Sequence, residues 1–146
     1  MRVHIQVRAF VLLLVLSASV SFAEDDPVKA GERIYFDGIL ASGESMSALV
    51  NGDVPIYGET IVCFTCHRRS GMGLSEGPTV VPSVVGEILF TDLALPTSRP
   101  PAPPVLREAY TKESLARSIR DGIAPDGSAM DSLMPLYPLS DEDMDA

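Results

Sequence analysis

Apolar residues with helical spacing mark the first element that the sequence predicts. Val28, Ile34 and Tyr35 fall on one face of a helix. Asp26 is a suitable N-cap residue, and Pro27 suits the first helical position because it has no N–H to leave unpaired. The pattern therefore predicts a short helix that begins near Pro27.

Two short apolar stretches then flank a turn. SALV (47–50) and VPIY (54–57) lie on either side of NGD (51–53). Asn-Gly is a strong signal for a tight hairpin turn, because both residues accept a positive φ. The sequence predicts a small β-hairpin here, within residues 37–60.

The clearest helical pattern comes later in the chain. Leu115 and Ile119 share one face, Thr111 is a good N-cap, and Gly122 is placed to end the helix. Since the third residue of this helix is Ser114 and not an acid, we expect its capping box to be incomplete.

A last helix is predicted to begin close to the end of the sequence. Ser140 is the expected N-cap with Asp143 three residues later, and Leu139 and Met144 are placed to pack together across the helix start. The sequence ends at Ala146, after less than two turns. Because so short a helix is unstable alone in water, we expect an incomplete C-terminal helix.

The first 23 residues have the order of a secretory signal peptide. A basic start is followed by the apolar run AFVLLLVLSASV and by small residues at Ser21 and Ala23. The run is short for a membrane span. We expect cleavage after Ala23, a folded domain over residues 24–146, and a periplasmic or otherwise exported location. An uncleaved membrane anchor is the alternative.

The charge of the chain is strongly negative. The formal net charge is −9, and loss of residues 1–23 removes Arg2 and Arg8, which leaves 9 basic residues against 20 acidic ones and a net charge of −11. A chain this acidic repels nucleic acid, so no nucleic-acid partner is expected. The Pro-rich residues 95–105 predict an extended surface connection.

Both cysteines lie in the sequence CFTCH, as Cys63 and Cys66, directly before His67. The spacing C-x-x-C-H is typical of covalent haem attachment, in which each thiol adds to one vinyl group and the histidine binds the iron. A zinc site needs four ligands, and a redox disulfide normally opens a helix in a βαβ unit. These two possibilities, and chance clustering, remain as alternatives.

A methionine is the expected second axial ligand. His67 is the only histidine left once the signal peptide is removed, and a thioether is the usual partner of histidine. Met134 is the strongest candidate, because Pro135 stiffens its loop. Met130 and a water or vacant position remain as alternatives. The other methionines of the mature chain are Met46, Met72 and Met144.

Five sequence segments occur in the following order along the chain: GERIYF, CFTCH, PSVVG, SLARSIRDGI and MPLYPLSDEDMDA. In this order they resemble the segments of a class I cytochrome c domain, over most of residues 27–146. The resemblance implies a mainly α, small helical domain with one covalently bound haem c. It also implies that the carbonyl of Pro82 accepts a hydrogen bond from His67, and that the first and last helices cross near Gly31 and Tyr35.

Three further residues are expected near the haem. Arg68 and Arg69 are placed to pair with its propionates, with solvated surface charge as the alternative. Tyr137 is expected either to donate to a propionate or to pack against the ring edge.

The chain departs from the family pattern twice. Residues 37–60 are inserted before the haem motif, and the C-terminal helix stops at Ala146, which indicates an incomplete or truncated chain. The alternative is that another polypeptide or a partner domain supplies the missing packing. The function implied is electron transfer between redox partner proteins and not enzyme catalysis. The alternatives are a haem subunit of a larger periplasmic redox enzyme and a haem-based sensor or ligand-binding module. Membrane contact is expected only through an uncleaved signal segment.

Overall fold

The computed structural model describes residues 26–95 and 105–146. The helices are α1 (Pro27–Asp37), α2 (Cys63–His67), α3 (Gly86–Leu89), α4 (Lys112–Asp121) and α5 (Asp141–Asp145), with the 3-10 turn η1 (Glu59–Ile61) before α2. The strands are β1 (Ser47–Val50), β2 (Val54–Tyr57), β3 (Leu74–Glu76), β4 (Thr79–Val81), β5 (Leu93–Leu95) and β6 (Val105–Arg107). The predicted signal peptide and most of the Pro-rich connection lie outside the described residues.

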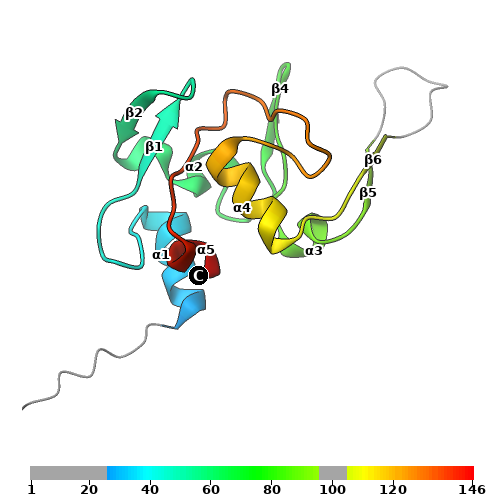
Figure 1. Ribbon diagram of the computed structural model, residues 1–146. Coiled ribbons are helices and arrows are strands. Elements are labelled where there is room, and N and C mark those ends of the chain that lie inside the picture. The colour runs from blue at the N-terminus through cyan, green and yellow to red at the C-terminus, as the bar shows by residue number, and fades with distance from the viewer. Residues whose placement is uncertain (1–25, 96–104) are drawn as a thin grey trace, which may run out of the picture.

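The fold is mixed α/β, so the prediction of a mainly α domain is wrong. Helices account for 34% and small antiparallel strand pairs for 21% of the structure. The strands form three separate two-stranded sheets, β1–β2, β3–β4 and β5–β6. In Figure 1, β1–β2 lie at the left of the molecule and β5–β6 at the right. Within the described ranges no helix is long and apolar enough to cross a membrane.

Two of the three hairpins were not predicted from the sequence, because their strands are so short. β3 and β4 have three residues each and meet around Gly77, whose φ of 58° suits a tight turn. β5 and β6 also have three residues each, and Leu95 pairs with Val105 across residues 96–104. Three positions are too few to show the alternation that marks a strand.

The hairpin predicted in the insertion is present. β1 and β2 pair antiparallel, with Val50 opposite Val54 at the turn end. Asn51 and Gly52 both have positive φ, of 53° and 84°. Two such residues give the turn whose twist matches that of the strands, which explains why this hairpin was readable from the sequence.

The predicted helix starts are confirmed, with one correction. Asp26 accepts a hydrogen bond from the Val28 N–H at 3.1 Å. Ahead of α4, Thr111 accepts from the Ser114 N–H, and the Ser114 hydroxyl accepts from the Thr111 N–H at 2.8 Å. The capping box is therefore complete, because a serine hydroxyl replaces the expected acid.

The insertion builds part of the hydrophobic core. The core consists of Ile34, Met46, Ala48, Ile61, Val62 and Tyr137. Two of these residues come from the insertion, and their exposed fractions are the lowest of the set, 2% for Met46 and 0% for Ala48. Residues 37–60 are therefore an integral part of the domain and not an appendage over its surface.

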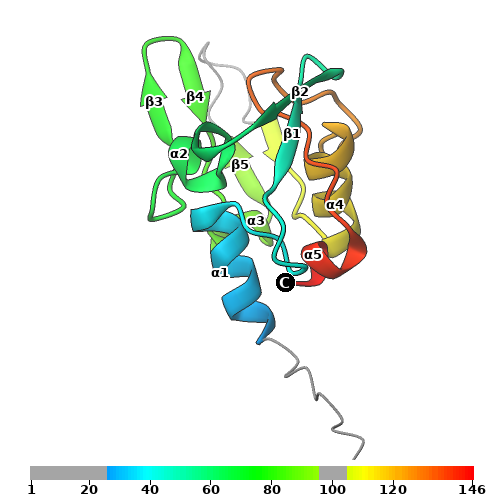
Figure 2. The ribbon, with the colours of Figure 1, turned by 90° about the vertical axis from the view of Figure 1, so that its left-hand side faces the viewer.

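The first and last helices are in contact, although the short C-terminal helix was expected to leave this packing missing. α5 lies beside α1 in both ribbon views (Figures 1 and 2), and a Cβ added at Gly31 would lie 2.5 Å from the carbonyl oxygen of Ala146. Asp143 of α5 also accepts a hydrogen bond from the Ala41 N–H at 2.9 Å. The five residues of α5 are enough to reach this crossing.

Candidate haem-attachment site

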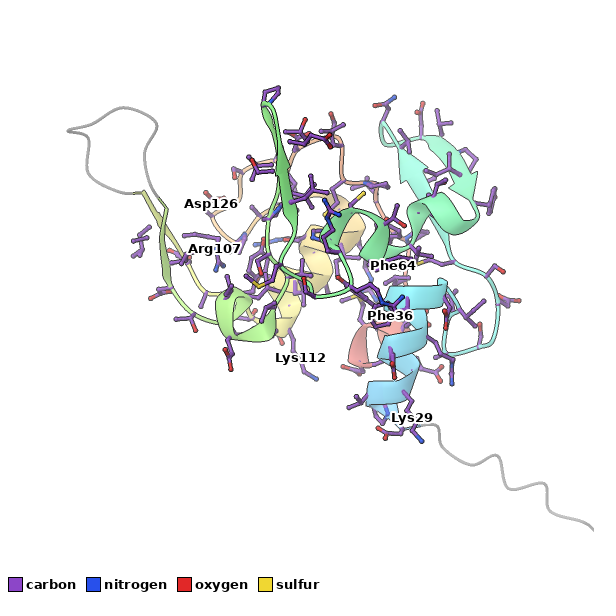
Figure 3. The ribbon with its side chains drawn as sticks, turned by 180° about the vertical axis from the view of Figure 1, so that it is seen from behind. Lys29, Phe36, Phe64, Arg107, Lys112 and Asp126 are labelled. Atoms are coloured by element: carbon purple, nitrogen blue, oxygen red, sulfur yellow. The ribbon has the colours of Figure 1, made fainter. Side chains whose placement is uncertain are left out.

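The site begins with α2, a single short helix held against the end of α1. The rings of Phe36 and Phe64 lie 5.9 Å apart, and Tyr35 packs edge-on to Phe36 at 4.9 Å. Figure 3 shows Phe36 and Phe64 next to each other where the two helices meet. Because α2 has only five residues, this packing and not helix propensity keeps it folded.

Both thiols of the CFTCH motif are free. Cys63 is partly buried and Cys66 is exposed. Residues three apart on a helix share a face, so the two sulfur atoms are presented on one side of α2. Burial, opposed by a backbone hydrogen bond and assisted by Cys66, raises the pKa of the Cys63 thiol. The thiol form therefore dominates at Cys63 at neutral pH.

His67 is buried at the end of α2, and its ring is oriented by Pro82. The Nδ1 atom lies 3.0 Å from the Pro82 carbonyl oxygen, as the resemblance implied. A carbonyl oxygen can only accept, so Nδ1 carries the proton, and in the neutral ring the lone pair remains on Nε2. In this tautomer Nε2 can bind a metal, and the hydrogen bond from Nδ1 to Pro82 raises the basicity of the ring.

The backbone after His67 has an unusual conformation that several hydrogen bonds maintain. Arg68 has φ 67° and ψ 162°, a region that is essentially restricted to glycine. Its carbonyl oxygen accepts from the Tyr35 hydroxyl at 2.7 Å and from the Gly71 N–H at 3.1 Å. The His67 carbonyl accepts from the Gly73 N–H at 3.0 Å. These bonds fix the chain direction as it leaves His67.

Arg68 and Arg69 have different surroundings. Both are exposed, but the Arg69 guanidinium lies 4.9 Å from the Phe36 ring centre and 5.8 Å from that of Phe64. It therefore makes cation–π contacts that join α1 to α2. The predicted pairing of the two arginines with propionates stays a prediction, and for Arg69 it competes with these aromatic contacts.

Tyr137 is buried and its hydroxyl already has an acceptor. It donates to the Ile61 carbonyl oxygen at 2.7 Å, two residues before Cys63. Burial first, and then the nearby Cys63 and Cys66, raise the pKa of Tyr137, so the hydroxyl stays protonated. Its single proton is not free for a propionate in this arrangement, while packing against a ring edge stays a prediction.

Met134 lies in the loop after α4 and packs against the core while remaining partly exposed. Together with Met130 it lines a cavity of about 390 Å³. Other residues around this cavity are Leu49, Asn51, Asp121, Asp131 and Leu136. His67 does not line this cavity, and the binding of iron by both His67 and Met134 stays a prediction.

The donor chemistry of the site fits a covalent haem. Two free thiols on one side of a helical turn and an imidazole with its lone pair on Nε2 are the groups that such attachment requires. In the described part of the chain, no three His, Cys, Asp or Glu side chains gather around a possible ion position. Comparison with protein-family models, curated proteins and solved structures finds no match to the chain.

Three contributors to the site were not found from the sequence. The Ile61 carbonyl and the Tyr35 hydroxyl act through contacts across 76 and 33 positions, which no local pattern reveals. Phe64 lies inside the motif but at one of its two variable positions. The cation–π contact of Arg69 with Phe36 joins residues 33 positions apart, so no local pattern indicates it either.

Proposed function

We propose that this protein is an exported one-electron carrier with a single covalently bound haem. The observation that carries the proposal is the hydrogen bond between His67 Nδ1 and the Pro82 carbonyl, directly after two free cysteines in the C-x-x-C-H spacing. A chance cluster of these residues has no reason to present Nε2 as the free nitrogen. The packed turn of α2 also gives the two thiols a fixed relation to the imidazole.

Each residue has a distinct role in the proposal. Cys63 and Cys66 would hold the haem through thioether bonds, and His67 and Met134 would bind its iron. The haem supplies an iron that changes between the ferrous and ferric states. Pro82 keeps the imidazole of His67 oriented, and a thioether from Met134 favours the reduced state and raises the reduction potential. An iron bound by both His67 and Met134 would have no position left for a substrate, which favours electron transfer over catalysis.

The first experiment is coexpression of the full chain with a c-type haem maturation system, followed by purification from the periplasm. We expect haem that stays bound after denaturation, and a weak long-wavelength ferric absorption band from the iron–thioether bond. Cys63→Ala and Cys66→Ala should each remove one covalent link. Met134→Ala should abolish the band, whereas the matched variant Met130→Ala should keep it.

Three outcomes would contradict the proposal or change it. A wild-type chain without covalent haem would overturn it. Covalent haem without the thioether band would favour a haem-based sensor or ligand-binding module, because one axial position would then be open. Copurification in fixed stoichiometry with a redox enzyme would assign the protein as a subunit of that enzyme.

A further inference from the structure

The insertion is joined to the loop that carries Met134. The Leu49 N–H donates to the Leu136 carbonyl at 2.8 Å, and the Leu136 N–H donates to the Leu49 carbonyl at 2.9 Å. β1 therefore pairs with β2 on one edge and with residue 136 on the other. The segment before α5 runs alongside β1 in Figures 1 and 2.

The next residue, Tyr137, is held from two further directions. Its N–H donates to the Ile119 carbonyl of α4 at 2.9 Å, and its hydroxyl donates to the Ile61 carbonyl of η1 at 2.7 Å. Two consecutive residues are thus bonded to three elements, β1, α4 and η1. One of these bonds is buried, where an unpaired partner is costly.

Met134 itself has weaker support. Its N–H donates to the Asp131 carbonyl at 3.1 Å, within a local turn, and Asp131 is exposed. Pro135 follows and has no N–H to donate. The hydrogen bonds that lie nearest to Met134 in sequence and join its loop to other elements are therefore those of Leu136 and Tyr137.

We propose that the hydrogen bonds of Leu136 and Tyr137 to β1, α4 and η1 control how easily Met134 would leave the iron, with Tyr137 as the positioning residue. This inference rests on the proposed function. The loop has a closed state, in which residues 136 and 137 are bonded to β1, α4 and η1, and an open state in which these bonds are broken and Met134 is displaced. A small exogenous ligand binds the iron only in the open state. Its apparent affinity is therefore proportional to the open fraction.

Tyr137→Phe tests this without removing the ring. The variant loses the hydroxyl that Ile61 accepts, and we expect the apparent affinity of the ferric holoprotein for imidazole to rise about two- to tenfold, from the usual net worth of one hydrogen bond. Amide hydrogen exchange at Leu136 should accelerate, while exchange in α1 should change less. The thioether band should remain, because the closed state still dominates.

Two control variants separate this effect from general destabilisation. Tyr57→Phe is the chemical match, since Tyr57 lies in the same insertion and is 69% exposed. Ala30→Gly lowers helix stability in α1, at a buried position remote in sequence from the loop. Neither control should change the affinity for imidazole.

The results distinguish the inference from the proposed function. Equal imidazole affinity in Tyr137→Phe and wild type, with covalent haem and the thioether band present in both, would overturn the inference and leave the electron carrier standing. An equal rise in Ala30→Gly would also overturn it, since global unfolding would then explain ligand entry. Absence of covalent haem from the wild type would overturn both.

Discussion

At the scale of single residues, Arg68 and Arg69 differ: Arg68 has a strained backbone conformation, and Arg69 makes cation–π contacts. Arg68 has a backbone conformation that costs a residue with a side chain about 1–3 kcal/mol. Glycine has no such cost but loses about 0.5–1 kcal/mol in backbone entropy on folding. We expect Arg68→Gly to stabilise the protein by about 1 kcal/mol, because relief of strain outweighs the entropy. Urea unfolding measures this as a higher midpoint at unchanged slope.

Arg69→Gly is the matched control. Arg69 does not have a positive φ, and the substitution removes the contacts with Phe36 and Phe64. We expect a loss of about 1–2 kcal/mol, from the cation–π contacts and the added backbone entropy. A destabilised Arg68→Gly variant would show that the side chain of Arg68 contributes more than its backbone costs.

The same residues show which parts of the site could be predicted. The contact of His67 with Pro82 could be predicted, because CFTCH and PSVVG occur in the order in which the resembled family has its histidine and the proline whose carbonyl accepts a hydrogen bond from it. The strain at Arg68 had no signal in the sequence, since arginine is not a residue type that marks positive φ. The second role of Tyr137, as donor to Ile61, depends on a contact between distant segments.

At the scale of elements, α1 and α5 can cross closely because Gly31 has no side chain. A methyl group at Gly31 would lie 2.5 Å from the Ala146 carbonyl oxygen and 2.9 Å from its carbon, both backbone atoms. Alanine gains about 1 kcal/mol over glycine in helix propensity, but a forced displacement of packed backbone costs about 1–3 kcal/mol. We expect Gly31→Ala to destabilise the protein by about 1 kcal/mol, measured by urea unfolding.

Gly86→Ala provides the comparison in α3. Its added methyl group would lie 3.8 Å from the Phe90 ring, an ordinary contact. This variant should be neutral or slightly more stable. If both variants gain stability, α5 moves away from α1 at little cost, and the crossing does not contribute to the fold as described.

Elements were predictable where a local signal determined them. The caps at Asp26 and Thr111 and the turn at Asn51 each depend on residues within four positions of one another. The three-residue strands β3 to β6 exist because of pairing between strands and carry no pattern of their own. The burial of Met46 and Ala48 was also unreadable, since it depends on contacts with Ile61 and Tyr137.

At the scale of the whole molecule, Asp143 joins α5 to the insertion through a hydrogen bond from the Ala41 N–H. Burial alone raises its pKa, but hydrogen bonds from Ser140 and from the Ala41 N–H, with the charge of Arg120, outweigh this, and the pKa of Asp143 is lowered. A lowered native pKa means that the unfolded chain binds the proton more tightly. The stabilisation is therefore complete above about pH 4, the ordinary aspartate value, and is lost as the pH falls through the native pKa.

Unfolding measured at a series of pH values tests this contribution. Asp143→Asn should lose about 1–2 kcal/mol at neutral pH and show a smaller decline in stability below pH ~4 than the wild type. Asp145→Asn, whose side chain is 77% exposed, is the control in the same helix and should follow the wild-type curve. Identical curves for all three proteins would show that other carboxylates cause the acid sensitivity.

The bond between Tyr137 and Ile61 also divides the chain topologically. The hydrogen bond joins the two ends of a chain segment that spans 76 positions. The β5–β6 hairpin belongs to this segment and extends away from the rest of the domain (Figure 1). Closure entropy grows only with the logarithm of loop length, so even a doubling of this loop costs about 0.6 kcal/mol. The β5–β6 hairpin is therefore where the domain can gain or lose sequence, or accept a fused module, with the least effect on the geometry around His67.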